Sequence, residues 1–239
     1  MAGGPNLCPR EATTLEHIFA LVLSSWLAFG PSRSRYARVG TVRETSEKEL
    51  ILCNQLARRQ VLLELGGFNE VLYPNEENAL MDEVQKRGGK LIYDPDLIVY
   101  RRPRSNLKSF ARMLMTYGRG RAEQLRAHPT LGSAPNLAPP LLLVYLVLLP
   151  FIYWLAGAWG FVLLGLYVVA LAVQASALPL RGKVFHALAA IPLIVLTHLL
   201  YGFGFWRGLF TKFRSSRQGP AAPVVLETVG VQYRDVGTV

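Results

Sequence analysis

The sequence of 239 residues contains little charge and few cysteines. Only 18% of its residues are charged and 51% are hydrophobic, a balance that excludes an intrinsically disordered chain. Its two cysteines, Cys8 and Cys53, are too few for a disulfide framework or a four-thiolate zinc site. The metal-binding spacings HExxH and CxxC are absent, and no histidine has a serine or cysteine partner at a known catalytic spacing. The residues therefore give no argument for a zinc protein or a triad hydrolase.

Charged residues are missing altogether from two long segments, Ala127–Leu180 and Val184–Trp206. A membrane-spanning helix needs about 20 apolar residues, so the second segment fits one span and the first fits a hairpin. A soluble helical core is the weaker interpretation, because so long a charge-free stretch has no polar face for water. The sequence predicts a linker at 127–140. It predicts three transmembrane helices after the linker, at 141–158, 160–178 and 185–206.

The orientation of these helices stays open at the level of sequence. Three spans place the N-terminal half and the basic tail, 207–239, on opposite sides of a membrane. That arrangement opposes the tendency of basic residues to stay in the cytoplasm. Two spans with one re-entrant or surface segment remove the conflict, whereas helix length favours three. The end of the tail has little pattern and is expected to lack fixed structure.

The first 126 residues have a soluble composition, with 19 Lys or Arg and 14 Asp or Glu residues. Helical and strand-like segments alternate in this half, which predicts an α/β domain. The expected helices are 58–65 and 76–87, and the expected strands are 90–93 and 97–100. Thr14–Gly30 carries an apolar stripe at helical spacing and is expected to be a helix, either in the core or on a membrane surface.

Residues 104–126 are expected to form a basic amphipathic helix directly before the first span. Phe110 and Leu114 fall on one face, and Lys108 and Arg112 fall on the opposite face. Such a helix typically lies in the lipid headgroup plane, and the alternative is an ordinary solvated basic face.

The segment Tyr117-Gly118-Arg119-Gly120-Arg121 lies within that helix and is expected to weaken it. Glycine lets a backbone approach a ligand closely, and the arginines beside it could hold a pyrophosphate through paired hydrogen bonds. Taken alone, this pattern is a weak indication of a binding site.

The acidic pair Glu76-Glu77 is the best catalytic candidate. It opens a predicted helix after Asn75, which is expected to be the N-cap. Acidic residues in a first helical turn also stabilise the helix dipole without any catalytic role, so both interpretations remain. A carboxylate in this place could serve as a general base toward a hydroxyl group.

A series of short motifs then occurs in a fixed order along the chain. They are Gly3-Gly4-Pro5-Asn6, Cys53-Asn54, Arg58-Arg59, Gly66-Gly67-Phe68-Asn69-Glu70, Pro74-Asn75-Glu76-Glu77, Gly88-Gly89, Asp94-Pro95-Asp96, the segment 117–121 and His198-x-x-Tyr201-Gly202-x-Gly204-Phe205. Their number, order and spacing resemble glycosyltransferase family 2, and more narrowly the membrane-bound bacterial enzymes of succinoglycan and related exopolysaccharide synthesis.

The resemblance implies the C-terminal, acceptor-side half of a GT-A fold, followed by a membrane region of about three spans. It implies transfer of a sugar, usually with inversion, from a nucleotide sugar to a lipid-linked or growing saccharide at the cytoplasmic face of the inner membrane. It also implies that Glu77 is the base, although the family usually has aspartate there, and that Glu76 supports the loop.

The resemblance also implies two groups of binding residues. Gly66, Gly67 and Phe68 match the segment that lines the acceptor site. Arg119 and Arg121 lie near the place of a Gln/Arg-rich motif that sits beside the diphosphate on an interfacial helix.

One part of the family pattern is missing. Family members begin with a nucleotide-binding half that contains a metal-binding Asp-x-Asp, whereas Asp82 is the first aspartate here. The resemblance therefore implies a divalent metal, Mg or Mn, whose usual ligands are absent from this sequence. The expectation is a truncated enzyme or a subunit whose donor-binding half comes from a second chain. The alternative is a non-catalytic membrane protein, and the scattered basic charge argues against a nucleic-acid binder.

Overall fold

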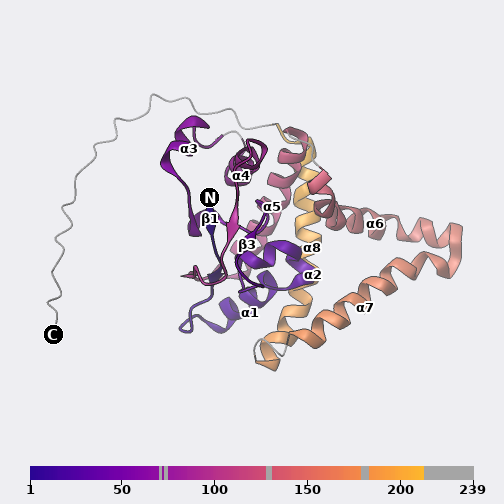
Figure 1. The fold of residues 1–239 in the computed structure, drawn as a ribbon. Coiled ribbons are helices and arrows are strands. Elements are labelled where there is room, and N and C mark those ends of the chain that lie inside the picture. The colour runs from indigo at the N-terminus through magenta and orange to yellow at the C-terminus, as the bar shows by residue number, and fades with distance from the viewer. Residues whose placement is uncertain (70–71, 73–74, 128–130, 179–182, 213–239) are drawn as a thin grey trace.

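The computed structural model describes residues 1–69, 72, 75–127, 131–178 and 183–212 (Figure 1). These residues are mostly helical. The helices are α1 (Thr14–Leu23), α2 (Trp26–Phe29), α3 (Arg59–Glu64), α4 (Glu76–Lys86), α5 (Leu107–Ala127), α6 (Ala138–Ala156), α7 (Val162–Ala177) and α8 (Val184–Phe210). Short 3-10 segments are Gly30–Arg35, Leu52–Asn54, Leu131–Leu137 and Gly157–Phe161.

The strands in this part of the chain are two residues long and form two small sheets. They are β1 (Ala2–Gly3), β2 (Asn6–Leu7), β3 (Arg43–Glu44), β4 (Gln55–Leu56), β5 (Ile92–Tyr93) and β6 (Val99–Tyr100). One sheet has the order β3-β5-β1-β4, with β1 parallel to β5 and the outer strands antiparallel to their neighbours. The other sheet pairs β2 with β6 in parallel. The expected strands are thus present but shorter than predicted. The N-terminal half, predicted to be an α/β domain, contains far more helix than strand.

The predicted helix over residues 14–30 is two helices. It breaks at Ser24 and Ser25, because the Ser25 side chain accepts a hydrogen bond from the Ala28 amide and so begins α2 as an N-cap. The apolar stripe of α1 is in the core: Phe19 is fully buried and stacks on Phe110 of α5, with ring centroids 4.1 Å apart. Of the two alternatives for this segment, the core position is confirmed.

Helix α5 is continuous and runs parallel to α8. A Cβ atom added at Gly118 would lie 2.0 Å from the Tyr201 carbonyl oxygen, and one at Gly204 would lie 2.1 Å from the Met115 carbonyl oxygen. The glycines therefore allow two helix backbones to touch, as small residues do in close helix pairs. Gly118 and Gly120 do not interrupt the helix, and the backbone that Gly118 meets is that of α8.

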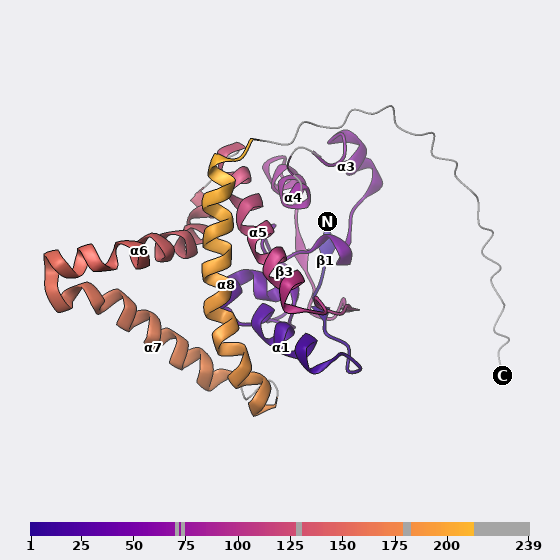
Figure 2. The ribbon, with the colours of Figure 1, turned by 180° about the vertical axis from the view of Figure 1, so that it is seen from behind.

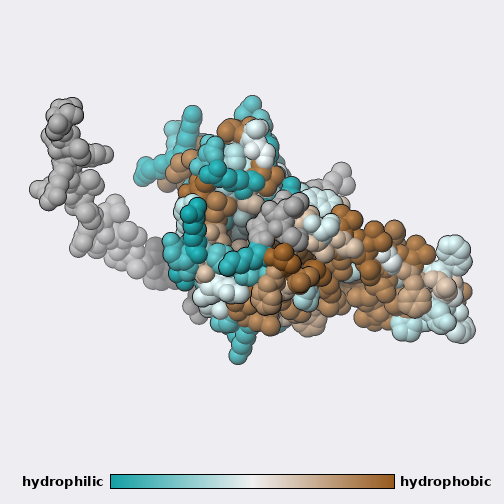
Figure 3. Space-filling view, turned by 90° about the horizontal axis from the view of Figure 1, so that it is seen from below, coloured by the Kyte–Doolittle hydropathy of each residue, from teal (hydrophilic) through white to brown (hydrophobic). Residues whose placement is uncertain are grey.

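Helices α6 and α7 form a hairpin that projects from the body, with the 3-10 segment Gly157–Phe161 at its tip (Figures 1 and 2). Hydrophobic side chains cover most of the hairpin surface except its tip, whereas the strongly hydrophilic ones gather on the body (Figure 3). By length and composition, the described residues contain two segments able to cross a membrane, Ala134–Ala177 and Val184–Phe210. The helices α6, α7 and α8 match the three predicted spans in position, while the number that cross stays a prediction.

Two predicted boundaries were wrong. The linker expected over 127–140 includes a 3-10 segment, Leu131–Leu137, and the start of α6. The tail expected from residue 207 begins later, because α8 continues to Phe210. Most of the predicted tail lies outside the described residues.

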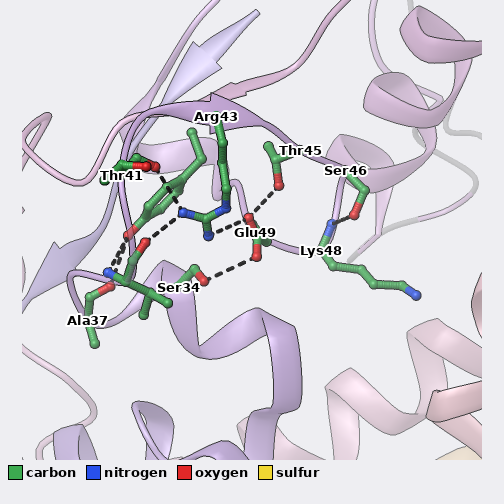
Figure 4. A network of polar contacts seen from close by, with 10 residues as sticks. Ser34, Ala37, Thr41, Arg43, Thr45, Ser46, Lys48 and Glu49 are labelled. Atoms are coloured by element: carbon green, nitrogen blue, oxygen red, sulfur yellow. Dashed lines mark hydrogen bonds and ion pairs between the residues drawn. The ribbon is translucent and has the colours of Figure 1, made fainter.

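A polar network shapes the loop between α2 and β4 (Figure 4). Arg43 donates to a Glu49 carboxylate oxygen at 2.8 Å, and Thr45 and Ser34 donate to the same carboxylate group. The Arg43 guanidinium also lies 4.4 Å from the centre of the Tyr93 ring. This network holds the loop against β5 of the larger sheet.

Replacing Glu49 with alanine is expected to lower the free energy of unfolding by about 1–2 kcal/mol, because partly buried donors lose their acceptor. Thermal unfolding in detergent measures the change. Glu44→Ala is the matched control, because its ion pair with Lys90 is exposed, and it is expected to cost less than about 0.5 kcal/mol. Equal stability of the two variants would contradict this role for Glu49.

Candidate functional site

A cavity of about 840 Å³ lies between the N-terminal half and helices α6–α8. This volume is in the range typical of small-molecule sites. The N-terminal half and α5 contribute polar and charged lining residues, which include Arg35, Tyr36, Lys48, Asn75, Glu77, Asn78, Arg101, Tyr117 and Arg121. Helices α2 and α6 contribute apolar ones, including Trp26, Leu27, Phe29 and Leu142. The cavity can therefore accommodate a ligand that has both a charged and an apolar part.

The first turn of α4 is attached to α5 by the side chain of Asn75. This buried amide donates to the Gly120 carbonyl at 3.0 Å and to Gln124 Oε1 at 2.8 Å, and its own oxygen accepts from Asn78 at 2.7 Å. Asn75 is the N-cap residue of α4, as predicted, but its side chain makes no capping bond. Its actual partners hold α4 so that Glu77 lines the cavity.

Burial raises the pKa of the Glu77 carboxyl above its ordinary value. Arg35 and Arg121 act in the opposite direction and favour the charged form, while the neighbouring Glu76 raises the pKa further. A carboxylate with a raised pKa at the wall of a cavity has the properties of a general base.

Three arginines, Arg35, Arg101 and Arg121, line the cavity with Glu77, and two of them, Arg35 and Arg121, interact with its carboxyl group. Arg35 donates to Asn78 Oδ1 at 2.6 Å, and Arg121 donates to Gln124 Oε1 at 2.9 Å. The buried Arg35 Nε has no hydrogen-bond partner among the described residues. Burial and the nearby Arg35 lower the pKa of Arg121, because two cations are held close together. Such a pair is suited to binding a phosphate or diphosphate group.

His198 lies where α8 faces α2 and α7. Its Nδ1 is 2.8 Å from the Tyr167 hydroxyl oxygen, and its Nε2 is 3.0 Å from the Leu27 carbonyl oxygen. Both ring nitrogens therefore have partners, which supports a structural role for His198 in joining three helices.

The remaining predicted site residues lie outside the cavity lining. Gly66 and Gly67 have φ angles of 73° and 79° and end α3, with the Gly67 amide donating to the Leu62 carbonyl at 2.9 Å. Phe68 follows them and is exposed. Their local role is to end a helix, and their expected contact with an acceptor remains a prediction.

Arg119 and Glu76 also do not line the cavity. Arg119 forms an ion pair with Glu123 of the same helix, with an N–O distance of 3.4 Å. One carboxylate oxygen of Glu76 is buried without a hydrogen-bond partner among the described residues. Of the predicted catalytic pair and arginine pair, the structure thus brings only Glu77 and Arg121 to the cavity.

Several lining residues were missed from the sequence: Arg35, Tyr36, Asn78 and Tyr167. Arg35 lies in a stretch of serines and arginines with no motif, and Tyr167 lies in an apolar helix. Arg35, Tyr36 and Tyr167 carry no local signal, because they come from segments far from Glu77 in the chain, whereas Asn78 directly follows the Glu76-Glu77 pair.

Within the part of the chain that the structure describes, no group of three or more His, Cys, Asp or Glu side chains could hold a metal ion. The Mg or Mn implied by the family resemblance does not fit these residues. We therefore assign no chemical step of this chain to a metal.

The chain is similar to the succinoglycan biosynthesis protein ExoA of Rhizobium meliloti (strain 1021), with 28% identity over 204 residues. The match covers 82% of this chain and 57% of that protein, so the chain spans somewhat more than half the length of this distant homologue. No protein-family model matches the chain, and no solved structure matches it.

Proposed function

We propose that this chain forms the acceptor side of a membrane-bound glycosyltransferase of exopolysaccharide synthesis. The observation that carries the proposal is the cavity in which the partly buried Glu77 carboxyl, with Arg35 and Arg121 beside it, faces apolar side chains from α2 and α6. Similarity to a succinoglycan biosynthesis protein supports the biosynthetic setting. We place the enzyme in the inner membrane, with its N-terminal half in the cytoplasm.

Glu77 acts as the general base in this proposal. It accepts the proton of an acceptor hydroxyl as that oxygen forms a bond to the anomeric carbon of a nucleotide sugar. The bond from that carbon to the diphosphate breaks, and the nucleoside diphosphate leaves with the electron pair. Attack from the face opposite the leaving group inverts the anomeric configuration. A raised pKa makes the carboxylate a stronger base at neutral pH than an exposed glutamate.

Arg35 and Arg121 bind a phosphate group of a substrate, either the lipid phosphate of the acceptor or the diphosphate of the donor. The apolar lining from α2 and α6 binds the hydrocarbon chain of a lipid-linked acceptor. A single cavity thereby holds the reacting hydroxyl near the base while the lipid part stays out of water.

The donor site is proposed to lie outside this chain, on a second chain that supplies the nucleotide-binding half and its metal. Two apolar side chains near the edge of the larger sheet support a protein partner. Leu56 in the edge strand β4 is 71% exposed, and Leu63 in α3 is 62% exposed. Uncovered apolar groups near an unpaired strand edge favour association.

The same exposed surface favours a second candidate function, a non-catalytic partner subunit of a glycosyltransferase. In that case the chain anchors or positions another enzyme, and Glu77 takes no part in the reaction. The purified chain would then bind no nucleotide sugar by itself.

The test uses membranes from cells that lack this chain. They are expected not to transfer labelled sugar from nucleotide sugars into the lipid-extractable fraction, and restoring the chain is expected to restore transfer. Undiminished transfer without the chain would reject both candidates. Restoration by a Glu77→Gln chain would reject the catalytic candidate and support the subunit.

A further inference from the structure

Helix α8 runs along the body over its whole length, whereas α6 and α7 project from it (Figures 1 and 2). Its first half packs against α1, in a buried cluster that contains Phe19, Ala187 and Ala190. Its second half packs against α5, and the two helices run in the same direction. The close pairs are Met115 with Gly204, Arg119 with Gly208, and Arg126 with Thr211.

The helices beside α8 are charged. Helix α5 carries exposed Lys108 and Arg112, and Arg126 near its end donates to the Gly208 and Thr211 carbonyls of the α8 end. Glu16 of α1 pairs with Arg102 at 3.6 Å. If α8 crossed a bilayer, these neighbours would enter the hydrocarbon with it, and burying such charges there is costly.

The outward face of α8 is mostly apolar, and its exposed residues lie toward the two ends of the helix. Exposed residues recur at helical spacing and lie opposite the buried ones. The exposed residues of the helix are Val184, Phe185, Leu188, Pro192, Phe203, Arg207 and Phe210, and of these Arg207 alone is charged. Phe185 is 69% exposed and Phe210 is 82% exposed, so large side chains are uncovered at both ends of a helix about 40 Å long.

We infer that α8 lies flat on the membrane surface, with its apolar face against lipid, and that only the α6–α7 hairpin enters the hydrocarbon core. Lipid is the occupant that fits, because α8 contacts the apolar hairpin, with Trp206 of α8 donating to the Pro140 carbonyl of α6, and because basic side chains such as Arg207 and Lys212 border the apolar face. This inference rests on the membrane placement in the proposed function and not on the sugar chemistry.

A flat α8 places the N-terminal half and the chain after Phe210 on the same side of the membrane. The basic residues that follow α8 then lie on the same side of the membrane as the basic N-terminal half. This removes the conflict with the distribution of positive charge that three spans create.

The test measures nitroxide depth by electron paramagnetic resonance in vesicles of phosphatidylethanolamine and phosphatidylglycerol. Single cysteines replace Leu188, Phe203 or Phe210 in a Cys8→Ser, Cys53→Ser chain. The three labels are expected at one depth just below the headgroups, although residues 188 and 210 lie about 33 Å apart along the helix. Matched labels at Leu141, Leu148 and Leu155 on exposed positions of α6 are expected to change depth steadily.

If the depths of the three α8 labels range from one membrane interface to the other, the inference is overturned and the proposed function remains intact. Labels shielded from both oxygen and a water-soluble nickel reagent would also overturn it, because a protein partner would then cover the face. Failure of the chain to bind vesicles would overturn the inference together with the membrane placement.

A second measurement does not depend on depth. Arg10→Cys and Ser216→Cys are expected to react with an impermeant maleimide from the same side of sealed membrane vesicles. Reaction from opposite sides would show an odd number of crossings and overturn the inference.

Discussion

Replacing Glu77 with glutamine is expected to lower sugar transfer by about 10²–10⁴-fold, the range typical of losing a general base. Glutamine keeps nearly the same shape and can still accept hydrogen bonds, but it cannot take the proton of the acceptor hydroxyl. The measurement is transfer of labelled sugar from a nucleotide sugar in membranes whose activity depends on this chain. The amount of variant in the membrane fraction should be unchanged.

Glu76→Gln is the matched control, because Glu76 is the adjacent carboxylate and does not line the cavity. Its effect is expected to be far smaller. A Glu77→Gln variant with normal activity, or equal losses in both variants, would remove Glu77 as the base.

The pH dependence follows from the direction of the Glu77 pKa. The base must be deprotonated to act, and burial raises its pKa above the ordinary value of 4.5. Activity should therefore fall as the pH drops through this raised pKa, at a higher pH than an exposed glutamate would give, and should level off above it. The residual activity of Glu77→Gln should lack this acid limb.

Replacing Gly118 with alanine is expected to lower the free energy of unfolding by about 3 kcal/mol or more, at the upper end of the cost of overpacking. Its Cβ would lie 2.0 Å from the Tyr201 carbonyl oxygen, which belongs to the helix backbone and cannot turn away. Helices α5 and α8 must then separate. Gly204→Ala is expected to act in the same way, through the Met115 carbonyl.

Gly165→Ala in α7 is the control, because an added Cβ there meets no heavy atom within 4 Å. Alanine favours helix over glycine by up to about 1 kcal/mol, so this variant is expected to be as stable as the parent or slightly more so. Thermal unfolding in detergent followed by circular dichroism measures all three variants. A Gly118→Ala chain as stable as Gly165→Ala would contradict the close contact.

Local sequence patterns predicted most helices of the N-terminal half. The helix expected at 58–65 is α3 and the one at 76–87 is α4, because glycine pairs end both helices through contacts within a few residues. The strands were harder to delimit. Each is two residues long, and its length depends on where a distant strand pairs with it rather than on its own residues.

The candidate site could be predicted only in part. Glu77 and Arg121 were identified from motifs. The family resemblance distinguished Glu77 from Glu76, whereas nothing in the sequence separates Arg121 from Arg119. Adjacent or alternate helical positions point in different directions, so one side chain reaches the cavity while its neighbour does not.

Amino-acid composition and periodicity by themselves determined a charged N-terminal half, a charge-free C-terminal region and a basic amphipathic helix between them. These properties depend on the distribution of apolar and charged residues along the chain. Tertiary packing alone decided that Gly118 and Gly204 join two helices, that Arg35 lies beside Glu77, and that α8 runs along the body. These contacts join residues far apart in sequence, whose proximity local patterns do not encode.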